Sequence, residues 1–147
     1  MPIELNHTIV LSHDREQSAR FLAGILGLEP GAPFGPFLPL TVANGVTLDF
    51  ATAGPDAEIA AQHYAFLVSE EDFDGILARL VEGGIPIQAD PHGKHPGRIN
   101  RNDGGRGVYF PDPSGHGMEA FTRPYGSHPE SDLNGTTEEV PGATLPD

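Results

Sequence analysis

The sequence predicts an α+β fold built from two tandem modules, each made of a strand, a helix and then further strands. Three observations predict it. Residues 5–11 and 62–68 each alternate as a β-strand with one histidine near its start. Each of these strands is followed by an apolar pattern of helical period. Each half then ends in extended runs that carry one carboxylate, Asp49 in the first half and Glu119 in the second.

The first module spans about residues 3–53. A strand is predicted where apolar and polar residues alternate from 3 to 11, and a helix where apolar residues recur at helical spacing from 15 to 26. The Asn-Gly pair at 44–45 is the strongest short signal for a β-hairpin. It therefore predicts that the extended runs at 37–43 and 46–52 pair with each other.

The second module repeats this order between about residues 62 and 123. Ser69 is placed to cap a helix whose apolar stripe ends near Leu80. A long loop rich in Gly, Pro, His and Arg is expected at 89–106, and loops of this length inside a compact domain are often functional. The expected strands are 62–68, 85–88, 107–111 and 117–123.

Length and composition limit the class of protein. A chain of 147 residues can bury about 70% of its unfolded surface, enough for one compact domain or two repeats sharing a core. Residues 126–147 lose the apolar pattern, which predicts an acidic tail, flexible or laid over the surface, after a domain at 1–125. The chain has no cysteine, no run approaching the length of a membrane span and no signal-like N-terminus. We therefore expect a cytoplasmic protein with no membrane partner.

The net charge of −13 predicts that nucleic acids and anionic membranes are not partners, because such a field repels phosphate. Half of the eight basic residues nevertheless fall in a short basic loop at positions 94–106. This loop is either a solvated segment or a cationic patch that holds an anionic substrate. Its basic residues are Lys94, Arg98, Arg101 and Arg106.

His7, His63 and Glu119 are the parts of a site made of two histidines and one carboxylate, which leaves coordination positions open for substrate. Either histidine alone would more often be an ordinary strand residue, but their equivalent positions in two repeats favour ligation of Zn, Fe, Mn or Ni. Asp49 occupies the position of Glu119 in the first module. Because aspartate is shorter, Asp49 either binds the metal directly or orients a histidine.

Several further residues are candidates for substrate binding. Arg123 lies four residues after Glu119, so strand alternation places both on one face. It could bind an anion or pair with acidic neighbours. The long loop adds three more candidates for substrate contact, His95, Asn102 and Arg106.

The strand at 62–66, Gln-His-Tyr-Ala-Phe, and the segment from Tyr109 to Glu119, Tyr-Phe-x-Asp-Pro-x-Gly-His-x-x-Glu, resemble the vicinal oxygen chelate superfamily. This superfamily includes glyoxalase I, type I extradiol dioxygenases, fosfomycin-modifying enzymes and bleomycin-resistance proteins. The resemblance implies two βαβββ modules that form a cup-shaped mixed β-sheet around one divalent metal. It also implies a homodimer in which His7 of one chain meets His63 and Glu119 of the other. Tyr109 would then be a proton or hydrogen-bond donor beside Glu119, unless it serves in packing.

The resemblance implies Lewis-acid catalysis on a small oxygen-rich substrate, with Glu119 taking part. Lyase or isomerase chemistry is expected first and dioxygenase chemistry next. The segment before Val108 lacks the histidine typical of extradiol enzymes, and Ile9 replaces a threonine typical of fosfomycin enzymes. The alternative is a metal-free antibiotic-binding protein of the bleomycin-resistance type. Such proteins typically lack the ligand set, so the two histidines and the glutamate favour the enzyme.

Overall fold

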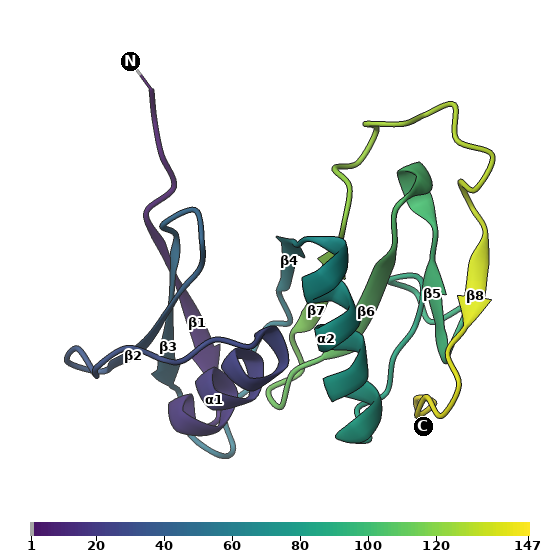
Figure 1. The fold of residues 1–147 in the computed structure, drawn as a ribbon. Coiled ribbons are helices and arrows are strands. Elements are labelled where there is room, and N and C mark those ends of the chain that lie inside the picture. The colour runs from purple at the N-terminus through teal and green to yellow at the C-terminus, as the bar shows by residue number, and fades with distance from the viewer. Residues whose placement is uncertain (1) are drawn as a thin grey trace. The chain divides into compact units, whose positions relative to one another are not determined.

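The computed structural model describes residues 2–147, and the chain divides into two compact units. The N-terminal unit contains the chain up to Ala61 together with Asp112–Gly115, and the C-terminal unit contains Gln62–Pro111 and His116–Asp147. Each unit has one helix and one mixed β-sheet (Figure 1). The prediction of an α+β fold is confirmed. No helix within residues 2–147 has the length and apolar character needed to cross a bilayer.

The N-terminal unit has a three-stranded sheet in the order β1-β3-β2, with β1 and β3 parallel and β2 and β3 antiparallel. Helix α1 contacts all three strands. Buried Leu22 and Phe50 belong to the core of this unit. The elements are β1 (His7–Ser12), α1 (Arg15–Leu26), β2 (Phe37–Thr41) and β3 (Thr47–Thr52).

Local signals explain where these elements begin and end. The Asp14 side chain accepts hydrogen bonds from the first free amides of α1, and Gly27, with φ of 75°, ends the helix in the left-handed conformation. Between β2 and β3, the Gly45 amide donates to the Val42 carbonyl, and Gly45 has φ of 87°. The Asn-Gly prediction of a hairpin is therefore confirmed.

The N-terminal unit departs from the sequence prediction in two places. The first strand begins at His7 rather than at residue 3. The unit also has three strands in its described part, one fewer than a complete βαβββ module. In the segment 28–36 the chain makes one isolated bridge, between Phe34 and Phe37. Three prolines in this segment, which donate no backbone hydrogen bond, explain the missing strand.

The C-terminal unit has a five-stranded sheet in the order β4-β7-β6-β5-β8. β4 and β7 are parallel and the other pairs are antiparallel. Helix α2 contacts β7, and its buried Phe73, Ile76 and Leu80 contribute to the core. The elements are β4 (His63–Leu67), α2 (Glu70–Glu82), β5 (Arg98–Asn100), a 3₁₀ turn (Asn102–Gly104), β6 (Gly107–Pro111), β7 (Gly117–Phe121) and β8 (Thr137–Glu139).

Residues 85–106 also differ from the prediction. The expected strand at 85–88 is reduced to isolated bridges, in which Gln88 pairs with both Tyr109 and Pro96. Pro86 and Pro96 lack a donor, so a regular ladder cannot extend here. The expected loop at 89–106 contains β5 and the 3₁₀ turn.

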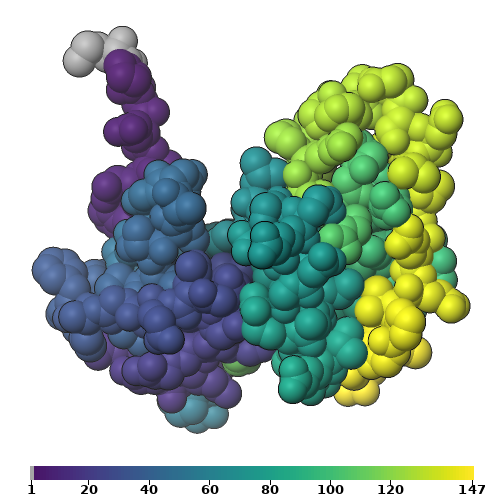
Figure 2. Space-filling view, viewed as in Figure 1, coloured from purple at the N-terminus to yellow at the C-terminus, as the bar shows by residue number. Residues whose placement is uncertain are grey.

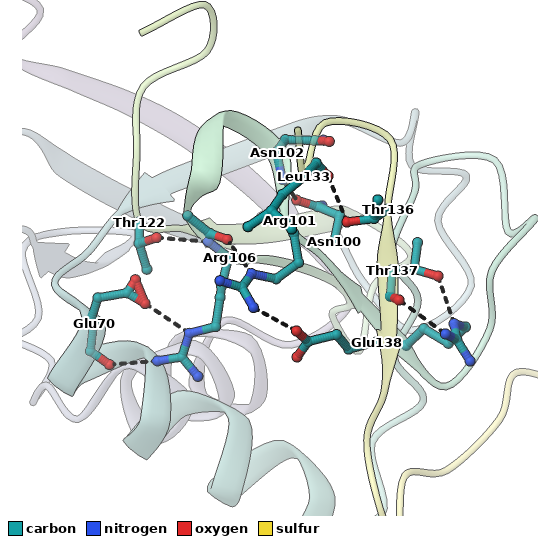
Figure 3. Close-up of polar contacts among 12 residues, drawn as sticks. Glu70, Asn100, Arg101, Asn102, Arg106, Thr122, Leu133, Thr136, Thr137 and Glu138 are labelled. Carbon is teal, nitrogen blue, oxygen red and sulfur yellow. Dashed lines mark hydrogen bonds and ion pairs between the residues drawn. The ribbon is translucent and has the colours of Figure 1, made fainter. Parts of the chain in front are cut away.

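The acidic tail adds an edge strand to the C-terminal unit. β8 pairs antiparallel with β5, and two loop arginines bind its acidic side chains. Arg101 Nη1 lies 2.5 Å from Glu138 Oε1 (Figure 3), and Arg98 Nη1 lies 3.5 Å from Glu139 Oε1. The tail follows the edge of this unit, in yellow in Figure 2. Two of the four basic residues of the loop are therefore paired with acidic residues of the tail.

Candidate metal centre

His63 and Glu119 meet on one face of the C-terminal sheet. Parallel β4 and β7 pair in a register that sets Ala65 opposite Glu119, two residues after His63 sits opposite Gly117. Strand alternation therefore turns the His63 and Glu119 side chains to the same face. His63 Nε2 lies 3.0 Å from Glu119 Oε1. The sequence prediction that these two residues come together is thus met by the geometry of neighbouring strands.

Glu119 is a buried carboxylate with both oxygens engaged. Its side chain is 1% exposed. Oε1 faces His63, and the Tyr125 hydroxyl donates a hydrogen bond to Oε2. The Tyr109 hydroxyl lies 3.0 Å from the Tyr125 hydroxyl. Because Tyr125 gives its one hydroxyl proton to Glu119, Tyr109 donates to the Tyr125 oxygen.

The tautomer of His63 is set by the backbone. Its Nδ1 lies 3.1 Å from the Gly117 carbonyl oxygen, which can only accept, so Nδ1 carries a proton. In the neutral ring, Nε2 is then an acceptor that faces an acceptor oxygen of Glu119. A divalent cation bound by both atoms, or a proton shared by the pair, resolves this conflict.

This donor set fits a metal ion. An imidazole nitrogen oriented through a backbone carbonyl, beside a buried carboxylate, is the usual arrangement of ligands for Zn, Mn, Fe or Ni. The Nε2–Oε1 separation of 3.0 Å is close to the spacing of two neighbouring ligands in an octahedral arrangement, each about 2.1 Å from one ion. Glu119 and His63 are therefore able to hold two positions of a metal centre.

Both tyrosines remain hydrogen-bond donors at neutral pH. Burial, followed by the hydrogen bond to Glu119, raises the pKa of the Tyr125 phenol well above its ordinary value of 10. Burial also raises the pKa of Tyr109, and the nearby Glu119 charge adds to the increase despite the opposing hydrogen bond with Tyr125. The Tyr109 ring stacks on His63 with centroids 5.9 Å apart.

His116 helps to hold β4 beside β7. This histidine is 1% exposed, and its Nδ1 accepts a hydrogen bond of 3.0 Å from the Gln62 amide. Gln62 directly precedes β4, while His116 directly precedes β7. The contact therefore fixes the starts of the two strands that carry the candidate ligands.

The N-terminal unit presents the equivalent positions with a different geometry. His7 pairs with Thr47 and Ile9 with Asp49, which is the same register as in the C-terminal unit. His7 is exposed, with Nδ1 2.8 Å from Asn6 Oδ1, and Asp49 is half-buried. Within residues 2–147, no group of three or more histidine and carboxylate side chains is close enough to hold a metal ion. Of the four predicted ligands, the structure places His63 and Glu119 in contact.

The predicted substrate-binding arginines have other partners in this structure. Arg106 lies 2.8 Å from Glu70 (Figure 3). It also lies 2.8 Å from Asp74, and its guanidinium lies 4.5 Å from the centre of the Phe73 ring. These contacts attach Arg106 to the first turns of α2. Arg123 Nη1 donates to the Asp103 carbonyl at 3.2 Å.

The other two loop candidates differ in exposure and contacts. Asn102 accepts a hydrogen bond from the Gly135 amide at 3.2 Å, so it holds the acidic tail. His95 is exposed, and its amide donates to Asp90 Oδ1 at 2.8 Å. Asp90 accepts three such amide hydrogen bonds and thereby shapes the loop around His95.

Tyr125 was not among the residues predicted from the sequence. It is the last residue of the predicted domain, four residues after β7 ends and directly before the predicted tail, where strand alternation no longer applies. Its ring stacks on Phe121, with centroids 5.1 Å apart. The recurrence of aromatic residues at 121 and 125 was the available signal, but it does not indicate which side chain reaches Glu119.

Comparison with known proteins gives two close likenesses. The chain is 33% identical over 119 residues to Glutathione transferase FosA from Serratia marcescens, covering 78% of this chain and 77% of that protein. It is 56% identical to the solved structure of Oxidase ChaP-H2, with a TM-score of 0.84 and coverage of 87% of this chain and 99% of that one.

A more distant structure supports the fold. Fosfomycin resistance protein FosX from Listeria monocytogenes, solved with Mn(II) and a sulfate ion, is 22% identical, with a TM-score of 0.63 over 84% of this chain and 93% of that one. The sequence model described as Glyoxalase/Bleomycin resistance protein/Dioxygenase superfamily matches residues 4–120. The match covers both repeated modules and both candidate ligands on the C-terminal sheet, and the chain belongs to this superfamily.

Proposed function

We propose that this protein is a metal-dependent oxidase that acts on a small oxygen-rich substrate. The observation that carries the proposal is the contact between His63 Nε2 and buried Glu119 Oε1, in a chain 56% identical to a protein named as an oxidase. Sequence reasoning alone placed lyase or isomerase chemistry first. The identities of 56% and 55% to two named oxidases favour oxidation instead.

In this proposal His63 and Glu119 are ligands of a divalent ion, and His7 is the third. Asp49 is assigned the role of orienting a ligand, because its side chain is shorter than that of Glu119. The bound ion would supply Lewis-acid activation of substrate oxygens. The protein contributes the fixed tautomer of His63 and the oriented carboxylate of Glu119. The Tyr109 hydroxyl, whose proton is directed to Tyr125, offers its oxygen as a hydrogen-bond acceptor for a substrate hydroxyl.

We further propose a homodimer in which His7 comes from the partner subunit. Uncovered apolar side chains on the faces that carry the ligands support this. On β1, Ile9 and Leu11 are 51% and 48% exposed. They alternate with buried Val10 on the same strand as His7. On β4, Leu67 is 57% exposed on the face of His63. A second copy would cover such surfaces.

For substrate contact, the proposal keeps His95 and Arg123 as candidates and gives Arg106 and Asn102 the structural contacts described above. The cytoplasmic location also stays a prediction. Metal-free antibiotic binding is disfavoured, because an apolar cup has no need for a buried carboxylate paired with a histidine.

The experiment is oxygen consumption by protein loaded separately with Fe(II), Mn(II), Ni(II) or Zn(II), with a panel of enediols, catechols and hydroquinones. We expect uptake of oxygen that requires one of the metals and is lost in His63→Ala. Metal-dependent isomerisation or elimination without oxygen uptake would contradict the proposed oxidation and support lyase or isomerase chemistry instead.

Glutathione transfer is the second candidate, because the chain is 33% identical to a protein named as a glutathione transferase. Disappearance of free thiol from glutathione mixed with fosfomycin and metal-loaded protein would support it. Ile9, at the position where fosfomycin enzymes typically have threonine, argues against this candidate.

A further inference from the structure

The chain that follows β7 returns to the candidate metal centre. Tyr125, six residues after Glu119, places its hydroxyl on Glu119 Oε2. Its ring is stacked on Phe121 but is 61% exposed as a residue, so burial of apolar surface contributes little to its position. Its position therefore depends on its two hydroxyl hydrogen bonds and on the backbone around it.

Asp103 fixes that backbone. Its carboxylate accepts hydrogen bonds from the Gly126 amide at 3.2 Å and the His128 amide at 3.0 Å, both just after Tyr125. The Asp103 amide donates to Asn134 Oδ1 at 2.6 Å. Asp103 is 6% exposed and is the one residue other than glycine with positive φ, 57°, within residues 2–147. A buried carboxylate in this conformation is retained for its contacts.

We propose that Tyr125 is a positioning residue for Glu119, held in place by Asp103 through the strap, which we define as residues 123–128. The inference rests on the proposed metal-dependent function. With Oε2 fixed by the Tyr125 hydroxyl, the carboxylate cannot turn, and Oε1 is directed at His63 Nε2. Glu119 then offers one oxygen to an ion shared with His63.

The hydrogen-bond order supports this role. Tyr109 donates to the Tyr125 oxygen, so the single Tyr125 proton is directed to Glu119. Arg123 ties the start of the strap to the Asp103 carbonyl at 3.2 Å. The strap therefore has an anchor on each side of Tyr125.

The test is titration of metal-free protein with Mn(II), followed by the electron paramagnetic resonance signal of free Mn(II). We expect Tyr125→Phe to bind Mn(II) about 10- to 100-fold more weakly than the wild type, the usual cost of losing a group that orients a ligand. Tyr64→Phe is the matched control. Its ring packs edge-on against His116 and alternates to the face opposite His63, so it should change the affinity less than about 2-fold.

Asp103→Asn is the second variant, because asparagine tolerates positive φ while it weakens the charge-assisted hydrogen bonds. It should lower Mn(II) affinity in the same direction as Tyr125→Phe, and the double variant should bind no more weakly than Tyr125→Phe alone. Wild-type affinity, or higher, in Tyr125→Phe would overturn this inference while the metal site stands. Wild-type protein that binds neither Mn(II) nor Zn(II) would overturn the proposed function and this inference together.

Discussion

The two units place a histidine and a carboxylate at equivalent points of equivalent sheets, yet they treat them differently. In each unit the histidine opens the first strand, and the carboxylate lies two residues beyond its register partner. Glu119 is buried and reaches His63, whereas Asp49 is half-buried and His7 contacts neighbouring Asn6. The duplicated strand register therefore places the histidine and the carboxylate near each other in both units. Other residues determine whether the two side chains come into contact.

Two features account for the difference. Glutamate is one methylene longer than aspartate, which lets Glu119 reach across to the neighbouring strand. The C-terminal unit also has the strap, whose Tyr125 holds the free oxygen of Glu119. The comparison indicates that a segment outside the repeat, the strap, orients the carboxylate of one module and has no counterpart at Asp49 in the other.

The largest expected effect is a difference in Mn(II) affinity between variants of Glu119 and Asp49. Glu119→Gln keeps the shape of the side chain and removes its charge. It should weaken Mn(II) binding by more than about 100-fold, because losing a group that only orients a ligand already costs about 10- to 100-fold. Asp49→Asn should cost about 10- to 100-fold if Asp49 orients a histidine, which is less than the loss at Glu119. Calorimetric titration of both variants and the wild type measures the difference.

Equal losses in Glu119→Gln and Asp49→Asn would contradict the asymmetry. They would indicate that both carboxylates bind the ion directly, and Asp49 would then return to the ligand set. Circular dichroism of the metal-free variants checks that a loss does not come from unfolding of the sheet around buried Glu119.

The next effect concerns β8, the edge strand that the tail adds to the C-terminal sheet and that has no counterpart in the described part of the N-terminal sheet. Removal of residues 137–147 deletes β8 and the partners of Arg98 and Arg101. We expect a loss of about 2 kcal/mol in the C-terminal unit, since each lost hydrogen bond contributes about 0.5–1.5 kcal/mol. Hydrogen exchange should accelerate at Ile99 and stay unchanged at Leu40 in β2. Equal acceleration in both sheets would mean that the units unfold together.

Much of the fold could be predicted because its signals are local. The predicted helix at 15–26 agrees with α1, and the predicted strand at 107–111 agrees with β6. Both depend on neighbouring residues and on caps such as Asp14. The pairing of β5 with β8 could not be predicted in this way, because Arg101 and Glu138 are 37 residues apart.

The candidate site also contains residues that local sequence signals predict and residues that they do not. His63 and Glu119 could be predicted to share a face, because strand alternation and the repeat determine their positions. Tyr125 could not, because its place depends on Asp103, which belongs to a different loop and has an unusual backbone conformation. Composition favoured a substrate role for Arg106 only slightly over a solvated loop. The contact with α2 depends on packing that the sequence does not reveal.

A smaller effect is the difference in unfolding free energy between a variant at α2 and a matched variant in α1. Arg106 ties the first turns of α2 to the sheet through Glu70, Asp74 and the Phe73 ring, so Arg106→Gln should lower the free energy of unfolding by about 1 kcal/mol. The matched control is Arg20→Gln in α1. Arg20 pairs with exposed Glu16 in the same helix, and its loss should cost less than about 0.5 kcal/mol. Urea unfolding measures both changes.

Substrate kinetics then separates the structural role of Arg106 from the predicted substrate role. If the arginine holds α2, Arg106→Gln should leave KM for an anionic substrate near the wild-type value. A severalfold rise in KM without a change in stability would restore Arg106 as a substrate-binding residue.

The smallest effect is the pH dependence of the contact between Arg106 and Glu70. Burial alone would raise the pKa of Glu70, but the hydrogen bonds from Arg106 and Thr122 and the Arg106 charge hold it below its ordinary value of 4.5. A carboxyl with a lowered pKa stabilises the fold above its unfolded pKa, and this contribution is lost as pH falls through the folded value. Because Glu70 is 55% exposed, solvent screening limits the contribution to below about 0.5 kcal/mol. Glu70→Gln should therefore be slightly less stable than the wild type at pH 6, and the difference should disappear near pH 3. A difference that persists at pH 3 would assign the effect to the shape of the side chain rather than to its charge.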